Sequence, residues 1–173
     1  MEALLARAQD VRLAVFDVDG VLTDGRLYFT SEGQEIKAFS TLDGQGIKML
    51  INAGIQTAII TGRQSSMVEQ RARSLGIHHL VQGREDKLTV LDQLLAELGL
   101  NYTQVAYLGD DLPDLAAIRR VALGMAVANA NSFVKQHAVG VTQARGGEGA
   151  AREFCELILQ GQNRLAEAQA VYL

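Results

Sequence analysis

Two aspartates, Asp17 and Asp19, stand one residue apart at the end of an apolar run and could carry out chemistry together. The run 11–16 is β-prone, and Gly20 opens a turn directly after the second acid. If this run is a buried parallel strand, its carboxyl end lies where open α/β sheets bind their ligands. Asp17 could then act as a nucleophile or metal ligand, and Asp19 as a general acid and base. A solvated turn after a strand would explain the same two residues, so the pair alone decides nothing.

Two other strand-like runs also end on polar residues, and a lysine opens a helix between them. Thr61 follows the run Gln56–Ile60, Asp110 follows the run 104–108, and Lys87 begins a helical pattern. Each has an ordinary structural explanation, as a helix cap, a turn or a surface lysine. Because the carboxyl ends of parallel strands meet at one edge, the sequence predicts that these residues gather beside the acidic pair.

Together these residues meet the needs of phosphoryl transfer, which requires an in-line nucleophile and positioned cations and donors. Asp17 could attack phosphorus, while Asp19 protonates the leaving alkoxide and then deprotonates the attacking water. Mg²⁺ prefers oxygen ligands, which Asp17, the Asp19 carbonyl and Asp110 would supply. The Thr61 hydroxyl and neighbouring N–H groups would bind the phosphoryl oxygens, and Lys87 would balance the clustered acids, so the sequence predicts a magnesium-dependent enzyme.

The composition fits a globular chain with no nucleic-acid or membrane partner. The 173 residues are 48% hydrophobic and include one proline, which argues against disorder. The net charge of -4 provides no basic surface for nucleic acid. No apolar run approaches the ~18 residues of a membrane span and no signal peptide precedes the first strand, so we expect a soluble, cytoplasmic protein. The single cysteine, Cys155, lies in an apolar helical pattern and is expected in the core.

Apolar β-prone runs alternate with amphipathic helical patterns along the chain. The expected strands are 12–16, Gln56–Ile60, His79–Val81, 104–108, Leu123–Ala126 and 139–141. The expected helices are 44–53, 65–75, Lys87–Leu98, 112–121 and Ser132–His137, followed by 150–159 and 165–171. This alternation predicts an α/β fold, a doubly wound, Rossmann-like parallel sheet with helices on both faces. Ser66 with Glu69 fits a capping box. Three glycines stand where helix C-caps belong: Gly54, Gly76 and Gly99. With no repeat or linker, we expect a single domain over residues 1–173.

One segment interrupts the alternation and predicts an inserted β-hairpin at about residues 24–40. Two β-prone runs, 26–30 and 35–40, are joined by the turn-like sequence Ser31-Glu32-Gly33-Gln34. The hairpin carries four large apolar side chains: Leu27, Phe29, Ile36 and Phe39. They either fold back on their own domain or, as we favour, pack against another subunit, since ribbons can pair to remove their edges.

The polar motifs at the strand ends, in their order along the chain, resemble those of the haloacid dehalogenase superfamily of phosphatases. The resemblance rests on Asp17-Val-Asp19-Gly, Thr61-Gly, Lys87 and Gly109-Asp110-Asp111 followed by Asp114. It implies that the first aspartate is the nucleophile and the second the acid and base. It also implies that the threonine and the lysine bind phosphate and that Asp110 binds the metal. Asp111 and Asp114 are implied to act behind the direct ligands or through water. Since only the hairpin is inserted, no large cap domain is expected, and neighbouring subunits would close the site.

Longer motifs resemble one family of that superfamily, the 3-deoxy-D-manno-octulosonate 8-phosphate (Kdo 8-phosphate) phosphatases. They are the strings 16–25, 43–47 and 145–153, and the resemblance covers residues 10–160. It implies hydrolysis of Kdo 8-phosphate in lipopolysaccharide biosynthesis and a tail, about 144–173, that helps to close a neighbour's active site. With the apolar hairpin, it leads us to expect a homotetramer.

An acid-sugar phosphate also carries a carboxylate, which needs cations beyond those at the phosphate. Lys48, Arg63 and Arg71 could supply them. Besides Asp19 and Lys87, the residues implied to contact the substrate are Ser40, Thr41, Leu42, Asp43, Gly44, Lys48, Arg63 and Arg71. A related nonulosonate phosphatase has Glu in place of Arg63, so Arg63 favours Kdo. Pro113 departs from the polar residue often found within the fourth motif.

Two alternatives remain open on the sequence. One is a phosphatase for another acid-sugar phosphate, such as a nonulosonate 9-phosphate. The other is a phosphoacceptor receiver domain, which shares the sheet, the acids and the lysine. Receivers, however, carry the phosphorylated aspartate after the third strand, and Thr61 stands in the corresponding region here.

Overall fold

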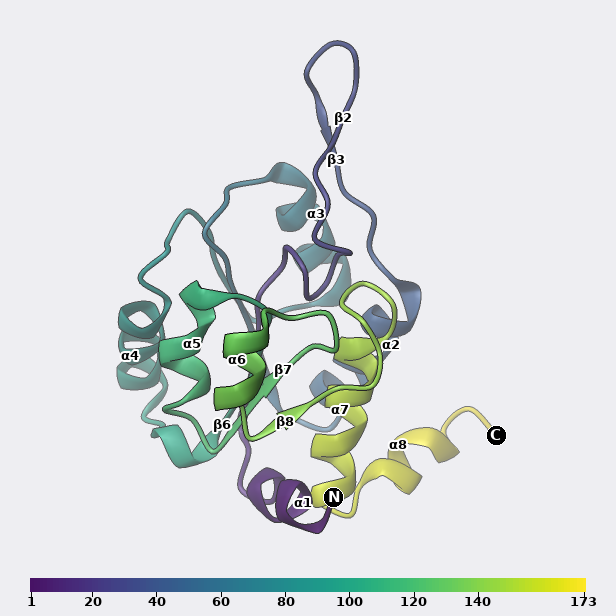
Figure 1. The fold of residues 1–173 in the computed structure, drawn as a ribbon. Helices are drawn as coiled ribbons and strands as arrows, with labels where there is room; N and C mark the ends of the chain where they lie inside the picture. The colour runs from purple at the N-terminus through teal and green to yellow at the C-terminus, as the bar shows by residue number, and fades with distance from the viewer.

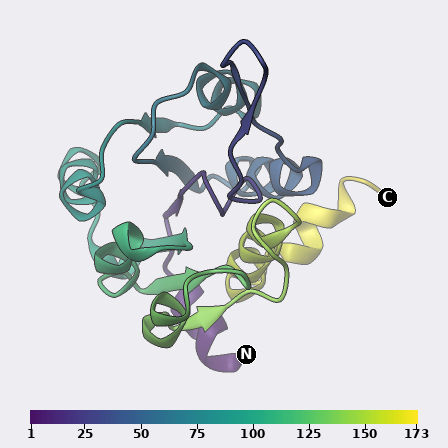
Figure 2. The ribbon, with the colours of Figure 1, turned by 45° about the horizontal axis from the view of Figure 1, so that its top comes forward.

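The computed structural model describes all 173 residues, and a six-stranded sheet lies at its centre. Its strands lie in the order β5 (His79–Val81), β4 (Gln56–Ile60), β1 (Leu13–Phe16), β6 (Val105–Gly109), β7 (Leu123–Ala126) and β8 (Gly140–Val141). Every pairing within this sheet is parallel. Figure 2 shows the strands in the middle of the molecule with the helices around them. The predicted doubly wound parallel sheet is confirmed.

Helices cover both faces of the sheet. The helices are α1 (Glu2–Ala8), α2 (Thr41–Asn52), α3 (Ser66–Leu75), α4 (Lys87–Leu98), α5 (Leu112–Ile118), α6 (Ser132–His137), α7 (Ala150–Gly161) and α8 (Leu165–Ala170), with a 3₁₀ turn at Tyr102–Gln104. On one face α2 packs against α7, and α7 packs against α1; on the other, α5 contacts both α4 and α6 (Figure 1). None of these helices is both long and apolar enough to cross a membrane.

The strand that precedes the acidic pair is buried on both faces. None of the four residues of β1 is exposed, which explains why the run is continuously apolar rather than alternating. Phe16 packs edge to face on Phe154 of α7, with ring centroids 5.7 Å apart. Cys155 is buried beside it, as expected from the sequence. This packing fixes the end of β1, and with it the backbone of Asp17, against the body of the protein.

Several local predictions differ from the structure. Ser65, not Ser66, precedes α3, and it forms no side-chain cap hydrogen bond; the Glu69 carboxylate accepts a hydrogen bond from Gln82 instead, so the predicted capping box is wrong. Gly76 and Gly99 end their helices in the left-handed conformation, as predicted. The helix α1 was not predicted from the sequence pattern.

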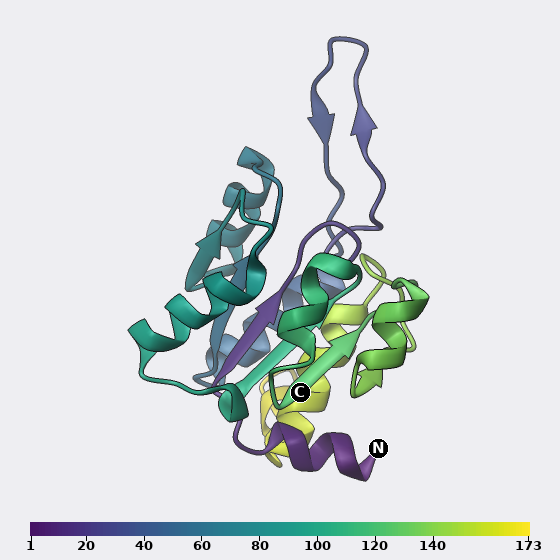
Figure 3. The ribbon, with the colours of Figure 1, turned by 60° about the vertical axis from the view of Figure 1, so that its left-hand side comes forward.

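The inserted hairpin is present but shorter than predicted. Only β2 (Tyr28–Phe29) and β3 (Glu35–Ile36) pair, in antiparallel fashion. Figures 1 and 3 show the hairpin standing away from the body of the protein. Leu27, Phe29 and Ile36 are 47%, 60% and 52% exposed. Phe39 differs from them, because it packs against the core of its own chain.

Candidate active site

A hollow of about 290 Å³ lies where β1, β4 and β6 end. It is lined by Asp17, Asp19, Gly25, Thr61, Gly62, Arg63, Glu85, Lys87, Asp110, Asp111, Pro113 and Asp114. The five residues expected to carry out phosphoryl transfer are all among them, although they come from four separate segments of the chain. Parallel strands bring their carboxyl ends to one edge, which is the reason the sequence prediction is met here.

Lys87 lies at the floor of this hollow between two carboxylates. Its Nζ is 2.8 Å from Asp17 Oδ1 and 2.7 Å from Asp114 Oδ1, and its side chain is only 4% exposed. Burial lowers the pKa of Lys87, but the carboxylates of Asp114 and Asp17 outweigh it and raise the pKa. A buried ammonium is tolerated only with such partners, so Lys87 stays charged beside Asp17.

Asp114 holds Lys87 in place and is itself fully hydrogen-bonded. Its Oδ1 accepts a hydrogen bond from the Tyr107 hydroxyl at 2.8 Å, and its Oδ2 accepts from the backbone N–H groups of Asp110 and Asp111 at 3.0 and 3.3 Å. Burial and the repulsion of Asp114 raise the pKa of Tyr107 well above its usual value, so the hydroxyl remains a donor. Tyr107 could not be predicted from the sequence, because an aromatic residue inside a buried strand looks like ordinary core.

Two glycines allow the acids to come this close. A Cβ at Gly20, whose φ is +90°, would lie 2.1 Å from Asp110 Oδ2. A Cβ at Gly109 would lie 2.5 Å from Asp114 Cβ. Side chains at either position would displace the carboxylates of the hollow.

Asp17, Asp110 and Asp114 form a set of carboxylates that fits a divalent cation. Each offers an oxygen within 4.8 Å of the others. Burial, followed by repulsion from Asp114, raises the pKa of Asp17 to about 6. Burial, followed by repulsion from Asp17, raises the pKa of Asp110 to about 8. A hard cation with oxygen ligands, such as Mg²⁺, would relieve this repulsion. Because the oxygens of Asp114 are already occupied, Asp17 and Asp110 are the better direct ligands.

Asp19 lies at the mouth of the hollow and faces two cations. Its Oδ1 contacts Nζ of Lys37, which comes from the hairpin, and its Oδ2 lies 3.7 Å from Arg63 Nε. Lys37 could not be predicted from the sequence, since nothing in the local pattern of the hairpin indicates that its return strand brings this lysine to Asp19. Thr61 is buried at the end of β4 and also lines the hollow.

Sequence comparisons agree with this arrangement. A family model described as haloacid dehalogenase-like hydrolase matches residues 76–154. A 3-deoxy-D-manno-octulosonate 8-phosphate phosphatase from Yersinia pestis is 47% identical over 165 residues, covering 95% of this chain and 88% of the relative. The enzyme of the same name from Escherichia coli K12 is 45% identical over 166 residues, covering 96% and 88%. The chain belongs to the Kdo 8-phosphate phosphatase family. This membership sets aside the receiver-domain alternative.

Solved structures extend the likeness to the whole fold. A Kdo 8-phosphate phosphatase from Moraxella catarrhalis, solved with magnesium, phosphate and Kdo, superposes with a TM-score of 0.98 at 44% identity, covering 100% of this chain and 99% of the other. A structure described as a probable YrbI-family phosphatase from Pseudomonas syringae superposes with a TM-score of 0.98 at 70% identity, covering 99% of this chain and 98% of the other. The fold and the expected family are therefore confirmed.

Of the residues that the Kdo 8-phosphate phosphatase resemblance assigns to the sugar, only Arg63 lines the hollow of its own chain. Lys48 is exposed on α2 and forms no ion pair. Arg71 donates a hydrogen bond from Nη2 to the Ser40 carbonyl at 3.0 Å, and its guanidinium lies 5.8 Å from the centre of the Phe39 ring. Within one chain, Arg71 thus holds the segment that leads into α2.

The segment 40–44 forms the start of α2 rather than a free loop. Ser40 is the N-cap residue, and Thr41 and Leu42 are exposed. The Asp43 carboxylate is buried and accepts a hydrogen bond at 2.9 Å from the Arg152 N–H, at the beginning of α7. Burial raises the pKa of Asp43. Gly44 is buried too, and a Cβ there would lie 2.3 Å from Arg71 Nη2. Asp43 therefore joins α2 to α7 in this chain, a role that the sequence did not predict.

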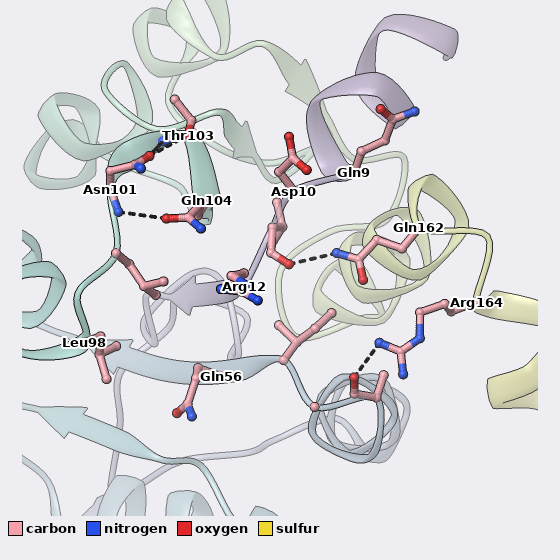
Figure 4. A pocket seen from close by; sticks show the side chains of 15 residues that line it. Gln9, Asp10, Arg12, Gln56, Leu98, Asn101, Thr103, Gln104, Gln162 and Arg164 are labelled. Atoms are coloured by element: carbon pink, nitrogen blue, oxygen red, sulfur yellow. Dashed lines mark hydrogen bonds between the residues drawn. The ribbon is translucent and has the colours of Figure 1, made fainter.

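A larger hollow of about 750 Å³ lies at the opposite, amino edge of the sheet (Figure 4). Gln162 crosses it and donates a hydrogen bond to the Val11 carbonyl at 2.8 Å, while Arg164 donates one to the Ala53 carbonyl at 2.5 Å. Asp10 is the only acid among its lining residues. With a single carboxylate, this hollow has no cluster of acids that could hold a divalent cation beside a nucleophile.

Proposed function

We propose that this chain is a magnesium-dependent phosphatase that hydrolyses Kdo 8-phosphate to Kdo and inorganic phosphate through an aspartyl-phosphate on Asp17. The observation that carries the proposal is the position of Asp17, beside the buried Lys87 and within 4.8 Å of Asp110, at an open polar hollow. The substrates named for the family's members support the choice of Kdo 8-phosphate.

The reaction proceeds in two displacements at phosphorus. A carboxylate oxygen of Asp17 forms the new P–O bond while the bond to the sugar oxygen breaks, and Asp19 gives its proton to that leaving oxygen. Asp19 then takes a proton from water, whose oxygen attacks phosphorus and releases Asp17. Bound at Asp17 and Asp110, Mg²⁺ would neutralise the carboxylates and the phosphoryl oxygens.

The remaining groups of the hollow hold the phosphoryl group. Lys87 approaches Asp17 from below and supplies a positive charge next to the oxygens that carry the transition-state charge. The Thr61 hydroxyl and the neighbouring backbone N–H groups donate hydrogen bonds to the same oxygens. Asp114 keeps Lys87 in position and does not touch the substrate.

Arg63 is the cation that we assign to the carboxylate of the sugar acid, because its side chain is 44% exposed at the mouth of the hollow. A guanidinium binds a carboxylate with two parallel hydrogen bonds. With this role, Arg63 would favour the binding of Kdo 8-phosphate over that of phosphates that lack a carboxylate.

We propose in addition that the protein is a homotetramer whose neighbouring subunits complete each site. Three features support it: the exposed apolar residues of the hairpin, the openness of the hollow, and the position of Lys48 and Arg71 outside the hollow of their own chain. Paired hairpins would remove exposed ribbon edges and exclude water from the hollow.

The proposal also includes a cytoplasmic location and a single domain over residues 1–173, both as expected from the sequence.

The experiment that tests the substrate compares kcat/KM for Kdo 8-phosphate, a nonulosonate 9-phosphate and a neutral sugar 6-phosphate, each with Mg²⁺. The proposal expects Kdo 8-phosphate to exceed both others by at least about tenfold, which corresponds to about 1.4 kcal/mol of transition-state binding. A higher kcat/KM for the nonulosonate 9-phosphate would favour the alternative acid sugar. Equal values for all three would refute the assignment of the carboxylate to a specific cation.

A further inference from the structure

Four charged side chains form a ring between the hairpin and the mouth of the hollow. Lys37 contacts Asp19 and lies 3.2 Å from Glu35 Oε1. Arg63 Nη2 lies 2.8 Å from the same Glu35 oxygen, and Arg63 Nε lies 3.7 Å from Asp19 Oδ2. Negative and positive groups alternate around this ring, so each charge has two neighbours of opposite sign.

The ring runs from a buried end to an exposed end. The exposed fraction of the side chain is 2% for Lys37, 16% for Glu35 and 44% for Arg63. A buried ammonium without carboxylate partners is costly, so Lys37 fixes the position of Glu35. Glu35 in turn holds one end of the guanidinium of Arg63, the long and flexible member of the ring.

We propose that Glu35 is a positioning residue that presents Arg63 to the carboxylate of the substrate. The inference rests on the proposed function, in which Arg63 binds that carboxylate. A guanidinium has five N–H donors. Arg63 Nη2 donates one hydrogen bond to Glu35 Oε1, and no contact engages Nη1. Nη1 and the second N–H of Nη2 therefore remain available for two parallel hydrogen bonds to an incoming carboxylate.

Ordering Arg63 before the substrate arrives lowers the entropy cost of binding. The negative charge of Glu35 does not repel the substrate strongly, because Lys37 lies 3.2 Å from it. Glu35 therefore affects the binding only of substrates that contact Arg63. The hairpin therefore contributes to selectivity for acid-sugar phosphates through a residue that does not touch the reacting atoms.

The test compares Glu35→Gln with Glu32→Gln, a matched control at the exposed tip of the same hairpin. Steady-state kinetics are measured with Kdo 8-phosphate and with 4-nitrophenyl phosphate, which has no carboxylate. For Glu35→Gln we expect KM for Kdo 8-phosphate to rise roughly fivefold with kcat nearly unchanged, as for a partly exposed ion pair. Its kcat/KM for 4-nitrophenyl phosphate should stay within about twofold of the wild type, and Glu32→Gln should change neither substrate.

A double-mutant cycle with Arg63→Ala separates positioning from a general effect on the hairpin. Without Arg63, Glu35→Gln should cause no further rise in KM, because the group that it positions is gone. A collapsed hairpin would instead lower activity in both backgrounds. The variant Glu35→Asp keeps the charge but shortens the side chain, so its KM for Kdo 8-phosphate should lie between those of the wild type and Glu35→Gln. If Glu35→Gln does not fold, Glu35→Asp provides the measurement.

Two results would overturn the inference. One is a KM that is unchanged or lower in the folded Glu35 variants, since Glu35 would then be neutral or a competitor of the substrate carboxylate. The other is an additive loss in the cycle with Arg63→Ala. If Arg63→Ala by itself leaves kcat/KM for Kdo 8-phosphate unchanged, the proposed role of Arg63 fails, and the inference about Glu35 fails with it. The phosphatase proposal is tested independently, by the activity of Asp17→Asn.

Discussion

Replacing Asp17 by Asn should abolish turnover and, in the absence of metal, make the protein more stable. An amide cannot form the aspartyl-phosphate, so we expect kcat to fall at least about a thousandfold, as it does when the nucleophile of other hydrolases is removed. The stability effect follows from the crowding of carboxylates. Burial, and then the charge of Asp114, raises the pKa of Asp17 from 3.8 to about 6, even though Lys87 opposes the shift.

The magnitude follows from that shift. A folded pKa above the unfolded one means that the folded chain is favoured at low pH and loses this advantage as the pH rises through about 6. The rise of the Asp17 pKa from 3.8 to about 6 corresponds to roughly 3 kcal/mol against the folded state at pH 7.5, because a pKa difference of one is worth about 1.36 kcal/mol. For a chain of this size, each 1 kcal/mol moves Tm by about 2–4 °C, so Tm should rise by about 6–12 °C.

Thermal unfolding by circular dichroism at pH 7.5 with EDTA provides the measurement. The difference in Tm between variant and wild type should shrink as the pH falls toward 5, where Asp17 of the wild type is largely protonated. Asp10→Asn is a matched control, since Asp10 is exposed at the far edge of the sheet and should change neither Tm nor activity. A lower Tm for Asp17→Asn without metal would refute the electrostatic reasoning, and a folded variant with wild-type turnover would refute the catalytic assignment.

Further predictions concern the metal, the substrate, the assembly and the fold. Because the pKa of Asp110 is raised to about 8, Mg²⁺ must displace a proton near neutral pH; calorimetry in buffers of different ionisation enthalpy should detect its release, and affinity should increase from pH 6 to 8.5. A pH-independent affinity would contradict this. Arg63→Ala should lower kcat/KM for Kdo 8-phosphate by about tenfold or more, with little change for 4-nitrophenyl phosphate; equal losses would assign the residue to phosphate chemistry or folding. Leu27→Glu with Phe29→Glu should dissociate the proposed tetramer and reduce activity together, and a fully active monomer in light scattering would end the assembly proposal. Asp43→Ala removes the acceptor at the start of α7 and should lower the free energy of unfolding by about 1–2 kcal/mol in urea titrations, with no loss there meaning that the buried carboxylate contributes nothing net.

The gathering of the residues to which we assign catalysis could be predicted from the sequence because their positions follow from local patterns. Asp17, Thr61 and Asp110 each end a continuous apolar run, and Lys87 begins a helix. Strands of one parallel sheet bring such ends to a common edge whatever the details of packing. Periodicity and turn residues therefore determined the sheet, the helices that follow its strands and the predicted residues of the hollow.

The hydrogen-bonding partners of those residues were decided only by the tertiary structure. Asp43 meets the start of α7 from 109 positions away, and Arg71 holds the Ser40 carbonyl instead of reaching the hollow of its own chain. Lys37 and Glu35 reach Asp19 and Arg63 because the hairpin returns over the end of β1. Such contacts depend on the direction and length of side chains carried by separate elements, which no periodic pattern encodes. The sequence thus determined which groups gather at the hollow, whereas packing between distant segments determined which charges surround them.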